Sequence, residues 1–290
     1  MIRPYVTDDG PQLVTIHNSV YPDSVHTTSS FGDYVAGTRA LGGFVWVIGI
    51  PAVVGYGSVT PVPGLPGIAE LAGCIAVDQQ RKGLGSRLLT SMLDKCRDSN
   101  IRQVTFSVDR LESPAASFLR QHYFFAEHEE WIMMFGEMAM VLQENCPGPV
   151  KLQTYARQTA VSLFCRLYEE SFSGLAWDQP YSELEVVERL DHADELLFLM
   201  LEGQAVGFAW TKLDSEGRGI VEPLGIVPPH QNRGYGRCLL TAAMRVLVNR
   251  GAKRIEIGAW RDNERAIELY RSLGFQRYKT ITYLAFNLAD

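Results

Sequence analysis

The chain alternates between two spacings of apolar residues, one typical of helices and one typical of strands. Apolar residues recur every three or four positions in Leu88–Cys96 and again in Leu239–Val248, which predicts two amphipathic helices. Two longer apolar runs, Phe44–Val59 and Leu196–Leu213, are each broken by glycine beside proline or polar residues, which predicts β-hairpins. Short strands around each helix complete the pattern of a mixed α/β sheet.

The same elements occur twice in the same order. Gly83 and Gly85 precede the first of the two helices, and Gly234 and Gly236 precede the second, 151 positions further on. The hairpins keep an offset of 152 and the helices near the end of each copy an offset of 150. One or two small insertions explain this drift, so we expect a duplicated domain.

Length and breaker residues place the domain boundaries. The chain has 290 residues, enough for two domains of ordinary size. The stretch 136–149 ends in ENCPGP, a cluster of proline and glycine that is typical of a linker. We expect one domain over residues 1–140 and a second over residues 150–290.

Composition excludes several classes of partner. Hydrophobic residues make up 46% of the chain and charged residues 21%, as in ordinary globular proteins, and the net charge is −6. This acidity argues against general binding to nucleic acids or anionic membranes, which attract lysine and arginine. No apolar stretch is long enough to span a membrane and the first residues lack a secretory signal, so we expect a cytoplasmic protein.

The five cysteines and six histidines form no recognisable redox or metal motif. No Cys-x-x-Cys pair occurs, so the cysteines are interpreted as reduced thiols. Cys238, beside the second glycine pair, is either a nucleophile or a packed core residue, and its leucine neighbours favour packing. No histidine spacing fits a zinc site, so we expect no metal.

Each glycine pair lies in a short motif at the start of a helix, QRKGLG in the first copy and QNRGYG in the second. Glycine costs a helix about 1 kcal/mol relative to alanine, so its presence needs a reason. The first turn of a helix has unpaired N–H groups and partial positive charge, and glycine lets an anion approach them. Basic residues in both motifs favour a phosphate or pyrophosphate ligand. A tight turn that binds nothing is the less favoured alternative, because the motif occurs twice.

The two motifs resemble the Q/R-x-x-G-x-G/A signature of the GNAT superfamily, whose members transfer an acetyl group from acetyl-CoA to an amine. The stretch DNERAIELYRSLGF, Asp262–Phe275, is similar to the N-x-x-A-x-x-L-Y-x-x-L-G-F segment near the end of that fold. The tandem plan and the TITYLAF ending resemble the mycothiol synthases within the superfamily. The resemblance covers nearly the whole chain and implies two tandem acyl-CoA N-acyltransferase domains, with acetyl-CoA as co-substrate.

The resemblance also implies that each copy contacts acetyl-CoA through its glycine loop and the strand before it. In the second copy, the residues assigned to acetyl-CoA are Leu224, Ile226, Val227, Gln231, Asn232, Arg233, Gly234, Tyr235, Gly236, Arg237 and Asn263. In the first copy they are Val77, Gln80, Arg81, Lys82, Gly83, Leu84, Gly85 and Ser86. Backbone amides near Ile226 and Val227 are expected to hold the acetyl carbonyl. Asn263 is equally suited to be a helix N-cap.

Two residues of the second copy are candidates for proton transfer. The acceptor amine must lose a proton, and Glu222, early in the strand before the loop, is the candidate base; a surface glutamate is the alternative. The departing thiolate must gain a proton, and the resemblance assigns this step to Tyr270. A tyrosine stays protonated at neutral pH and can act as an acid, the alternative being a buried aromatic residue on an amphipathic helix.

The first copy departs from the family pattern where the chemistry occurs. Aligning the last helices of the two copies places Arg120, Ser113 and Phe124 where the second copy has Tyr270, Asn263 and Gly274. Arginine does not donate a proton usefully. The glycine loop is also one residue shorter when it is counted from Val77. Glu70 and Tyr123 leave a shifted constellation open, but we expect a non-catalytic or degenerate first domain.

The acceptor is the part of the function that the sequence defines least. Segments Tyr21–Tyr34 and Ser171–Glu183 are expected to shape its pocket. Trp177 and Asp178 could receive a cationic amine, although a packed tryptophan and a solvated aspartate fit better. The sequence predicts an N-acetyltransferase whose second domain acts on a primary amine of a small molecule or peptide. The alternatives are an acyl-CoA-binding sensor without turnover and two active domains with different acceptors; a monomer and a homodimer are both compatible.

Overall fold

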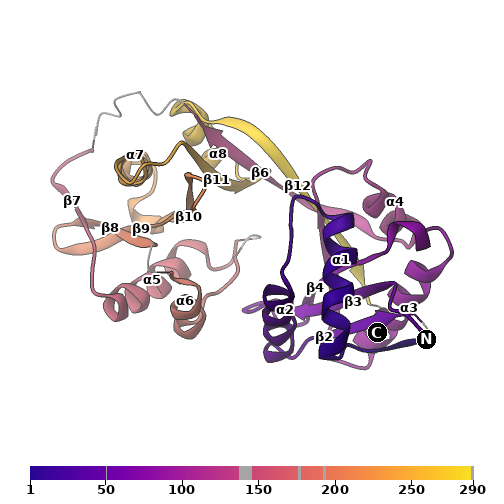
Figure 1. Cartoon of the computed structure of the whole chain (residues 1–290). Helices are drawn as coiled ribbons and strands as arrows, with labels where there is room; N and C mark the ends of the chain where they lie inside the picture. Colours follow the sequence, from indigo (N-terminus) through magenta and orange to yellow (C-terminus); the bar gives the residue numbers. More distant parts are fainter. Residues whose placement is uncertain (50, 137–145, 176–177, 192–193, 289–290) are drawn as a thin grey trace. The chain divides into compact units, whose positions relative to one another are not determined.

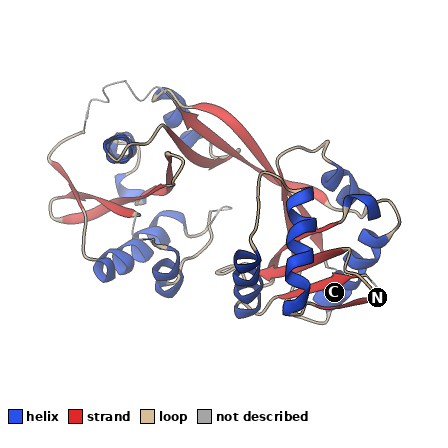
Figure 2. Ribbon diagram, in the orientation of Figure 1, coloured by secondary structure: helices blue, strands red, loops and turns tan. Residues whose placement is uncertain are grey.

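The computed structural model describes residues 1–290 except 50, 137–145, 176–177, 192–193 and 289–290. The chain forms two compact units, each containing strands and helices (Figures 1 and 2). The N-terminal unit comprises Met1–Glu127 and Thr282–Asp290, and the C-terminal unit comprises His128–Ile281. These units differ from the sequence repeats, because the final strand of each repeat belongs to the other unit.

The N-terminal unit contains six neighbouring strands in a mixed parallel and antiparallel arrangement. Its elements are β1 (Ile2–Pro4), η1 (Thr7–Asp9), α1 (Gly10–Val20), α2 (Thr28–Ala40), β2 (Phe44–Ile48), β3 (Gly55–Pro61), β4 (Ile68–Ile75), η2 (Val77–Gln79), α3 (Leu84–Arg97), β5 (Gln103–Val108) and α4 (Pro114–Gln121), where η denotes a 3₁₀ turn. The strand order is β1-β2-β3-β4-β5-β12, where β12 (Gln276–Asn287) is the last strand of the chain, and only β4 and β5 are parallel. The predicted apolar stripe of α3 is confirmed, since Leu88, Leu89, Met92, Leu93 and Cys96 are buried.

The C-terminal unit repeats this plan. Its elements are β6 (Phe125–Phe135), β7 (Val150–Gln153), α5 (Arg157–Phe172), α6 (Glu183–Arg189), β8 (Glu195–Leu201), β9 (Gln204–Leu213), β10 (Arg218–Ile226), η3 (Pro228–His230), α7 (Tyr235–Asn249), β11 (Arg254–Trp260) and α8 (Glu264–Ser272), together with residues 276–281 of β12. The strand order is β7-β8-β9-β10-β11-β6, and only β10 and β11 are parallel. The mixed α/β fold predicted from the sequence is therefore confirmed.

The exchanged strands are anchored in the cores that they join. From His128 onward, β6 belongs to the C-terminal unit and pairs with β11, and its residues Met133 and Phe135 are 0% and 2% exposed in that core. From Thr282 onward, β12 belongs to the N-terminal unit, pairs with β5 and buries Leu284. Each such side chain contributes about 1.5–3 kcal/mol of burial free energy, so the exchange is built into the stability of both units.

The two parallel strand pairs open at the same place. β4 and β5 pair over only three positions, from Ile68↔Gln103 to Glu70↔Thr105. β10 and β11 likewise pair over only three positions, from Arg218↔Arg254 to Ile220↔Glu256. In both units the two strands continue beyond the last pair, held by their outer neighbours, so an edge of backbone N–H and C=O groups faces an opening in the sheet.

The strand before the loop differs between the units by one residue. In the C-terminal unit, the register between β10 and β9 shifts between Val221 and Leu224, so Glu222 and Pro223 together lie opposite Trp210. In the N-terminal unit, β4 and β3 pair without a shift, and Ala72 alone lies opposite Ser58. The C-terminal unit thus has a β-bulge at Glu222, and bulges are common next to active sites because they redirect side chains.

Candidate active site

The two glycine loops have the same backbone conformation. Each follows a 3₁₀ turn and contains two left-handed residues, Arg81 (φ 61°) and Gly83 (φ 75°) in one, and Asn232 (φ 60°) and Gly234 (φ 83°) in the other. The N-cap of the 3₁₀ turn is Ala76 in the first loop and Val227 in the second. The expectation of a shorter first loop is therefore wrong.

The glutamine of each motif fixes the loop to the strand before it. Gln231 Nε2 donates a hydrogen bond of 2.8 Å to the carbonyl of Ile226, and Gln80 Nε2 donates one of 3.0 Å to the carbonyl of Ile75. In the C-terminal unit, Arg265 Nη1 donates to Gln231 Oε1 at 2.8 Å. Both loops are therefore held in place by the protein's own hydrogen bonds, and Arg265, which the sequence did not point to, supports the second one.

The two glycines of a loop have different explanations. Gly234 has a positive φ of 83°, which a residue with a side chain rarely adopts. Gly236 is helical, and a Cβ there would meet Leu269 at 3.4 Å, an ordinary van der Waals distance. Neither backbone strain nor packing therefore requires glycine at position 236, although alanine would favour the helix. Close approach of a ligand to this turn is the remaining explanation for glycine at position 236.

The other loop side chains divide into exposed and packed groups. Asn232 and Arg233 are exposed, Tyr235 is buried in the core, and Arg237 contacts the hydroxyl of Ser272. In the first loop, Lys82 Nζ donates to Gln79 at 3.1 Å, and Ser86 Oγ is 2.9 Å from His122 Nε2. Arg81 is exposed, Leu84 is half-buried, and Val77 is 62% exposed on the 3₁₀ turn.

The backbone of β10 offers only some of the amides that the sequence pointed to. The amide of Val227 donates a hydrogen bond of 3.0 Å to the carbonyl of Val206 on the outer side, so it is not available to a ligand. Because the direction of amides alternates along an antiparallel strand, those of Leu224 and Ile226 point the other way, toward the opening. The expectation for Ile226 stands as a prediction, and that for Val227 needs this correction.

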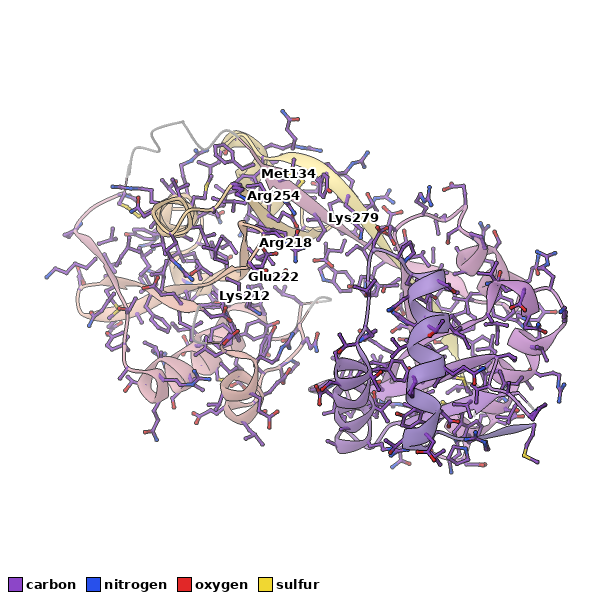
Figure 3. All side chains as sticks on the ribbon, viewed as in Figure 1. Met134, Lys212, Arg218, Glu222, Arg254 and Lys279 are labelled. Carbon is purple, nitrogen blue, oxygen red and sulfur yellow. A yellow bond between two sulfur atoms is a disulfide. The ribbon has the colours of Figure 1, made fainter. Side chains whose placement is uncertain are left out.

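Glu222 lies at the bulge of β10, beside Lys212 on β9 (Figure 3). The residue as a whole is exposed to solvent. Partial desolvation of its carboxylate, together with the negative charge of Glu130, raises the pKa of Glu222 to about 7, while Lys212 and Arg189 act in the opposite direction. Its carboxylate is thus half-ionised near neutral pH, as suits a group that takes up and releases a proton.

Tyr270 is buried in α8, with 5% of its surface exposed. Burial raises the pKa of its hydroxyl, and the nearby negative charge of Glu222 raises it further. The hydroxyl therefore stays protonated at neutral pH and can donate. Asn263 caps the same helix, accepting a hydrogen bond of 3.2 Å from the amide of Ala266, so its capping role is confirmed.

The structure corrects the alignment of the last helices. The amide of Phe124 donates to the carbonyl of Leu119 at 3.1 Å, just as the amide of Phe275 donates to the carbonyl of Tyr270 at 3.1 Å. Tyr123 (φ 67°) likewise has the left-handed conformation of Gly274 (φ 94°). The residue at the position of Tyr270 is therefore Leu119, not Arg120, and Gly274 corresponds to Tyr123, not Phe124. The alignment fails because α4 is one residue shorter than α8.

Among the described residues of the N-terminal unit, no acid–base pair takes the place of Glu222 and Tyr270. Glu70 pairs in parallel with Thr105 as Ile220 does with Glu256, so Glu70 corresponds to Ile220 and not to Glu222. Tyr123 is 85% exposed. The Tyr21 hydroxyl donates a hydrogen bond of 2.9 Å to the carbonyl of Gly73, which occupies a group on the open edge of β4.

The segment expected to shape the acceptor pocket packs close to Glu222. The amide of Gln179 donates to the hydroxyl of Tyr168 at 3.3 Å, and the charge of Glu222 affects the pKa values of both Tyr168 and Tyr181. Asp178 is half-buried, and its amide donates to the carbonyl of Leu175 at 3.0 Å. Trp177 lies outside the described residues.

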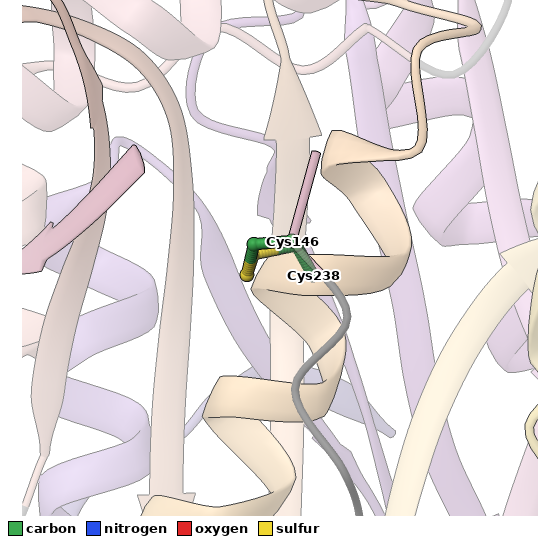
Figure 4. The surroundings of a disulfide bond; sticks show 2 residues. All are labelled: Cys146 and Cys238. Atoms are coloured by element: carbon green, nitrogen blue, oxygen red, sulfur yellow. A yellow bond between two sulfur atoms is a disulfide. The ribbon is translucent and has the colours of Figure 1, made fainter. Parts of the chain in front are cut away.

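The expectation of reduced cysteines is wrong for one pair. Cys146 and Cys238 form a disulfide with a Cα–Cα distance of 5.0 Å, within the usual range (Figure 4). Cys238 is 1% exposed, so its packing in the core is confirmed. The pairing escaped the sequence because the two residues are 92 positions apart and form no local motif. Cys74, Cys96 and Cys165 are free thiols.

Comparison with known proteins connects these features to one family. The family model described as "Acetyltransferase (GNAT) family" matches residues 11–124 and 161–275. A mycothiol acetyltransferase of Saccharopolyspora erythraea is 29% identical over 227 residues, which cover 73% of this chain and 74% of that protein. A mycothiol acetyltransferase of Gordonia bronchialis is 27% identical over 241 residues, which cover 78% of this chain and 76% of that protein.

Solved structures share the tandem fold. A GCN5-related N-acetyltransferase from Sphaerobacter thermophilus superimposes with a TM-score of 0.73 at 16% identity, covering 100% of this chain and 96% of that chain. A tandem GNAT protein from the clavulanic acid biosynthesis pathway gives a TM-score of 0.73 at 14% identity, covering 100% and 99%. At these identities the likeness concerns the fold. Among the described residues, no helix is long and apolar enough to cross a membrane.

Proposed function

This chain belongs to the GNAT family of acetyltransferases, and we propose that its C-terminal unit transfers the acetyl group of acetyl-CoA to a primary amine of a small molecule or peptide. One observation carries the proposal: Glu222, with a pKa of about 7, and the protonated Tyr270 lie close enough to interact electrostatically. Two groups with pKa values driven apart in this way are suited to act as base and acid.

The glycine loop and the edge of β10 are proposed to hold acetyl-CoA. The amides of Tyr235, Gly236 and Arg237, at the start of α7, have no partner within the helix and suit the pyrophosphate. The amides of Leu224 and Ile226 and the carbonyl of Leu224, which face the opening, suit the amide groups of the pantetheine arm, which can pair like a strand. The amide of Ile226 is then proposed to stabilise negative charge on the acetyl oxygen. Arg233, Arg237 and Arg265 add positive charge near the phosphates.

Glu222 and Tyr270 are proposed to move the two protons of the reaction. Above its pKa of about 7, Glu222 is ionised and takes a proton from the ammonium form of the acceptor, directly or through water. Tyr270 donates its hydroxyl proton to the departing sulfur of CoA. Each such group typically contributes 10²–10⁴-fold to a rate. Binding both substrates at once removes most of the entropic cost of bringing them together.

The N-terminal unit is proposed to be non-catalytic. It keeps a formed glycine loop that suits a phosphate, but Ala72 and Leu119 occupy the positions of the base and the acid. Tyr21 occupies one carbonyl of the open strand edge. The unit is therefore proposed to bind CoA without turnover or to act as a structural partner.

The acceptor is proposed to be a small amine related to mycothiol. The two curated relatives described above are mycothiol acetyltransferases, so the desacetyl form of mycothiol is the first acceptor to test. A sensor that binds acyl-CoA without turnover is the alternative function. Retention of Tyr270 next to a base with a pKa near 7 favours an enzyme.

The test is a thiol-release assay on the full-length protein. Full length is needed because each unit contains a strand from the other repeat. The protein is mixed with acetyl-CoA and a panel of amines headed by desacetyl mycothiol, and free CoA and acetylated product are measured. We expect release that depends on an amine and that Tyr270→Phe abolishes. Binding of acetyl-CoA without amine-dependent release for any member of the panel would favour the sensor.

A further inference from the structure

Strand β6 brings a second carboxylate to the C-terminal unit. Glu130 lies opposite Trp260 in the antiparallel ladder of β6 and β11, and Ile132 lies opposite Gly258. Side chains two positions apart on a strand share a face of the sheet. Glu130 and Gly258 are therefore diagonal neighbours on one face, although Glu130 belongs to the first sequence repeat and Gly258 to the second.

Gly258 leaves room for two carboxylates. A Cβ at this position would collide with Oε1 of Glu130 and would lie 3.5 Å from Oε1 of Glu222. Gly258 is not among the residues with positive φ, so conformational freedom does not explain why it is glycine. The missing side chain is explained by the two carboxylates that converge on it. The N-terminal unit has Ser107 at the corresponding position of β5.

We propose that Glu130 is a positioning residue for the reaction: its negative charge beside Glu222 strengthens Glu222 as the base that takes the proton of the acceptor amine. The proposal rests on the function proposed above. It also means that the first repeat supplies a residue to the active site of the second, so that the repeats are functionally inseparable.

Other charged and titratable groups also face Glu222. They are Tyr168 on α5, Tyr181 before α6, Arg189 on α6, Lys212 on β9 and Tyr270 on α8. Lys212 and Arg189 favour the ionised carboxylate and lower the pKa of Glu222. Among neighbouring side chains, Glu130 has the largest effect on that pKa and raises it. Removing this charge should therefore make Glu222 a weaker base.

The test is a titration of the Glu222 carboxyl by ¹³C NMR in the full-length protein, with Glu222→Gln used to assign its signal. In Glu130→Gln we expect the titration midpoint of Glu222 to fall by about 0.5–1 pH unit. Glu129→Gln is the matched control, because Glu129 is adjacent on the strand, faces the other side and pairs with Arg261 at 3.5 Å. In Glu129→Gln, the titration midpoint of Glu222 should equal that in the wild type.

Kinetics provide a second reading. The acidic limb of kcat/KM for the amine should move to lower pH in Glu130→Gln and stay in place in Glu129→Gln. Equal midpoints in all three proteins would overturn the role of Glu130. The NMR titration needs no turnover. A wild-type protein that transfers no acetyl group would therefore contradict the proposed function, and the titration would still test the effect of Glu130 on Glu222.

A separate observation concerns the disulfide at the second glycine loop. Cys238 lies in the first turn of α7, and its amide donates to the carbonyl of Gly234 at 3.1 Å. The bond to Cys146 brings Pro147 onto the loop, where its Cγ is 3.5 Å from the position that a Cβ on Gly234 would occupy. At Gly83, the equivalent residue, no described atom lies within 4 Å of that position. Among the described residues, Pro147 thus covers the second loop, and no residue covers the first loop in this way.

From this contrast we infer that the Cys146–Cys238 disulfide is a redox-controlled cover over the acetyl-CoA loop of the C-terminal unit. A low-molecular-weight thiol would open it: two thiol molecules are oxidised to their disulfide, and the two cysteines gain the two electrons and two protons. Cys146 is partly exposed and Cys238 is buried, so the attack falls on the sulfur of Cys146. In a reducing compartment such a bond would be transient, as is typical of disulfides that sense redox state.

Calorimetric titration of acetyl-CoA tests this cover. A Gly83→Val background removes the contribution of the N-terminal loop. We expect the reduced protein to bind at least about threefold more tightly than the oxidised one. Cys146→Ser should bind as tightly as the reduced protein whether or not a reductant is present. Equal affinities of Cys146→Ser and the oxidised protein for acetyl-CoA would overturn the inference. Because Cys146→Ser cannot form the disulfide, it tests the inference even if the bond in the wild type resists reduction.

Discussion

The N-terminal and C-terminal units are alike in their glycine loops and different in the strand that precedes them. Both loops have two left-handed residues and a glutamine that binds the carbonyl of the preceding strand. The preceding strands differ by a single bulge residue, which gives Glu222 and Pro223 in β10 where β4 has only Ala72. At the acid position the units have Tyr270 and Leu119.

The two units therefore share the fold and the loop but differ in the candidate acid–base residues. The loop depends on glycine conformation and backbone hydrogen bonds, which any copy of the fold can keep while it remains stable. Acid–base chemistry depends on a few side chains that a duplicated copy can lose without losing its core, and Leu119 is as well buried as Tyr270 (4% and 5% exposed). A binding site without turnover is therefore the expected fate of one copy.

The largest expected effect comes from the acid position. Tyr270→Phe removes one hydroxyl and keeps the buried ring, so turnover should fall by about 10²–10⁴-fold while acetyl-CoA affinity changes little. Tyr123→Phe is the control in the other unit, because this residue is 85% exposed. Steady-state rates and calorimetric affinities distinguish the two. If Tyr270→Phe kept full activity, Tyr270 would not be the acid.

A smaller effect is expected from the left-handed glycines. Valine at Gly234 or Gly83 introduces a β-branched residue at φ 83° or 75°, with a strain of about 1–3 kcal/mol in either unit. Only Gly234→Val should lower kcat/KM, by about 10–100-fold. The two variants are matched in strain, so thermal unfolding should be affected similarly. A comparable loss of activity in Gly83→Val would show that the N-terminal loop takes part in turnover.

The sequence was sufficient to predict the duplicated mixed α/β fold and the glycine loops. Both follow from local signals: apolar periodicity identifies the helices and hairpins, and the repeated Q-x-x-G-x-G motif identifies the loops. Glu222 and Tyr270 were found because they lie within or beside such motifs. The interaction between them comes from the fold, since 48 positions separate them.

The parts that the sequence missed depend on long-range pairing. Glu130 lies in the first repeat, and only the exchange of β6 brings it beside Glu222. Cys146 and Cys238 are 92 positions apart in the chain, and the fold brings them into contact. The alignment error at Arg120 arose because α4 is one residue shorter than α8, a difference that is visible only in the hydrogen bonds at the helix end.

Replacing the helical glycines should have a more modest effect. Stability should rise in both variants, and acetyl-CoA affinity should fall in one of them. Gly236→Ala and Gly85→Ala each meet only ordinary contacts, the nearest at 3.4 Å, so each should stabilise its helix by up to about 1 kcal/mol. Gly236→Ala should nevertheless weaken acetyl-CoA binding several-fold, because its Cβ would lie where the phosphate is proposed to approach. Gly85→Ala should leave kcat/KM unchanged. Gain of stability without loss of affinity in Gly236→Ala would contradict phosphate binding at this turn.

The smallest expected effect is a pH-dependent gain of stability in Glu222→Gln. In the folded protein the pKa of Glu222 is raised from 4.5 to about 7. Between these values the folded state binds more protons than the unfolded state, so stability falls as pH rises and the full penalty applies above pH 7. Glutamine removes this penalty, so the variant should be more stable than the wild type at pH 8.5 and nearly equal to it at pH 4.5.

Because solvent reaches Glu222, the gain in melting temperature at pH 8.5 should be small, about 2 °C. Glu112→Gln, at an exposed position of the N-terminal unit, provides the control and should show the same difference from wild type at both pH values. Differential scanning calorimetry of the three proteins measures the effect. If Glu222→Gln were instead less stable than the wild type at pH 8.5, the ionised carboxylate would stabilise the fold. Glu222 would then be a structural group and not a base whose ionised form destabilises the folded protein.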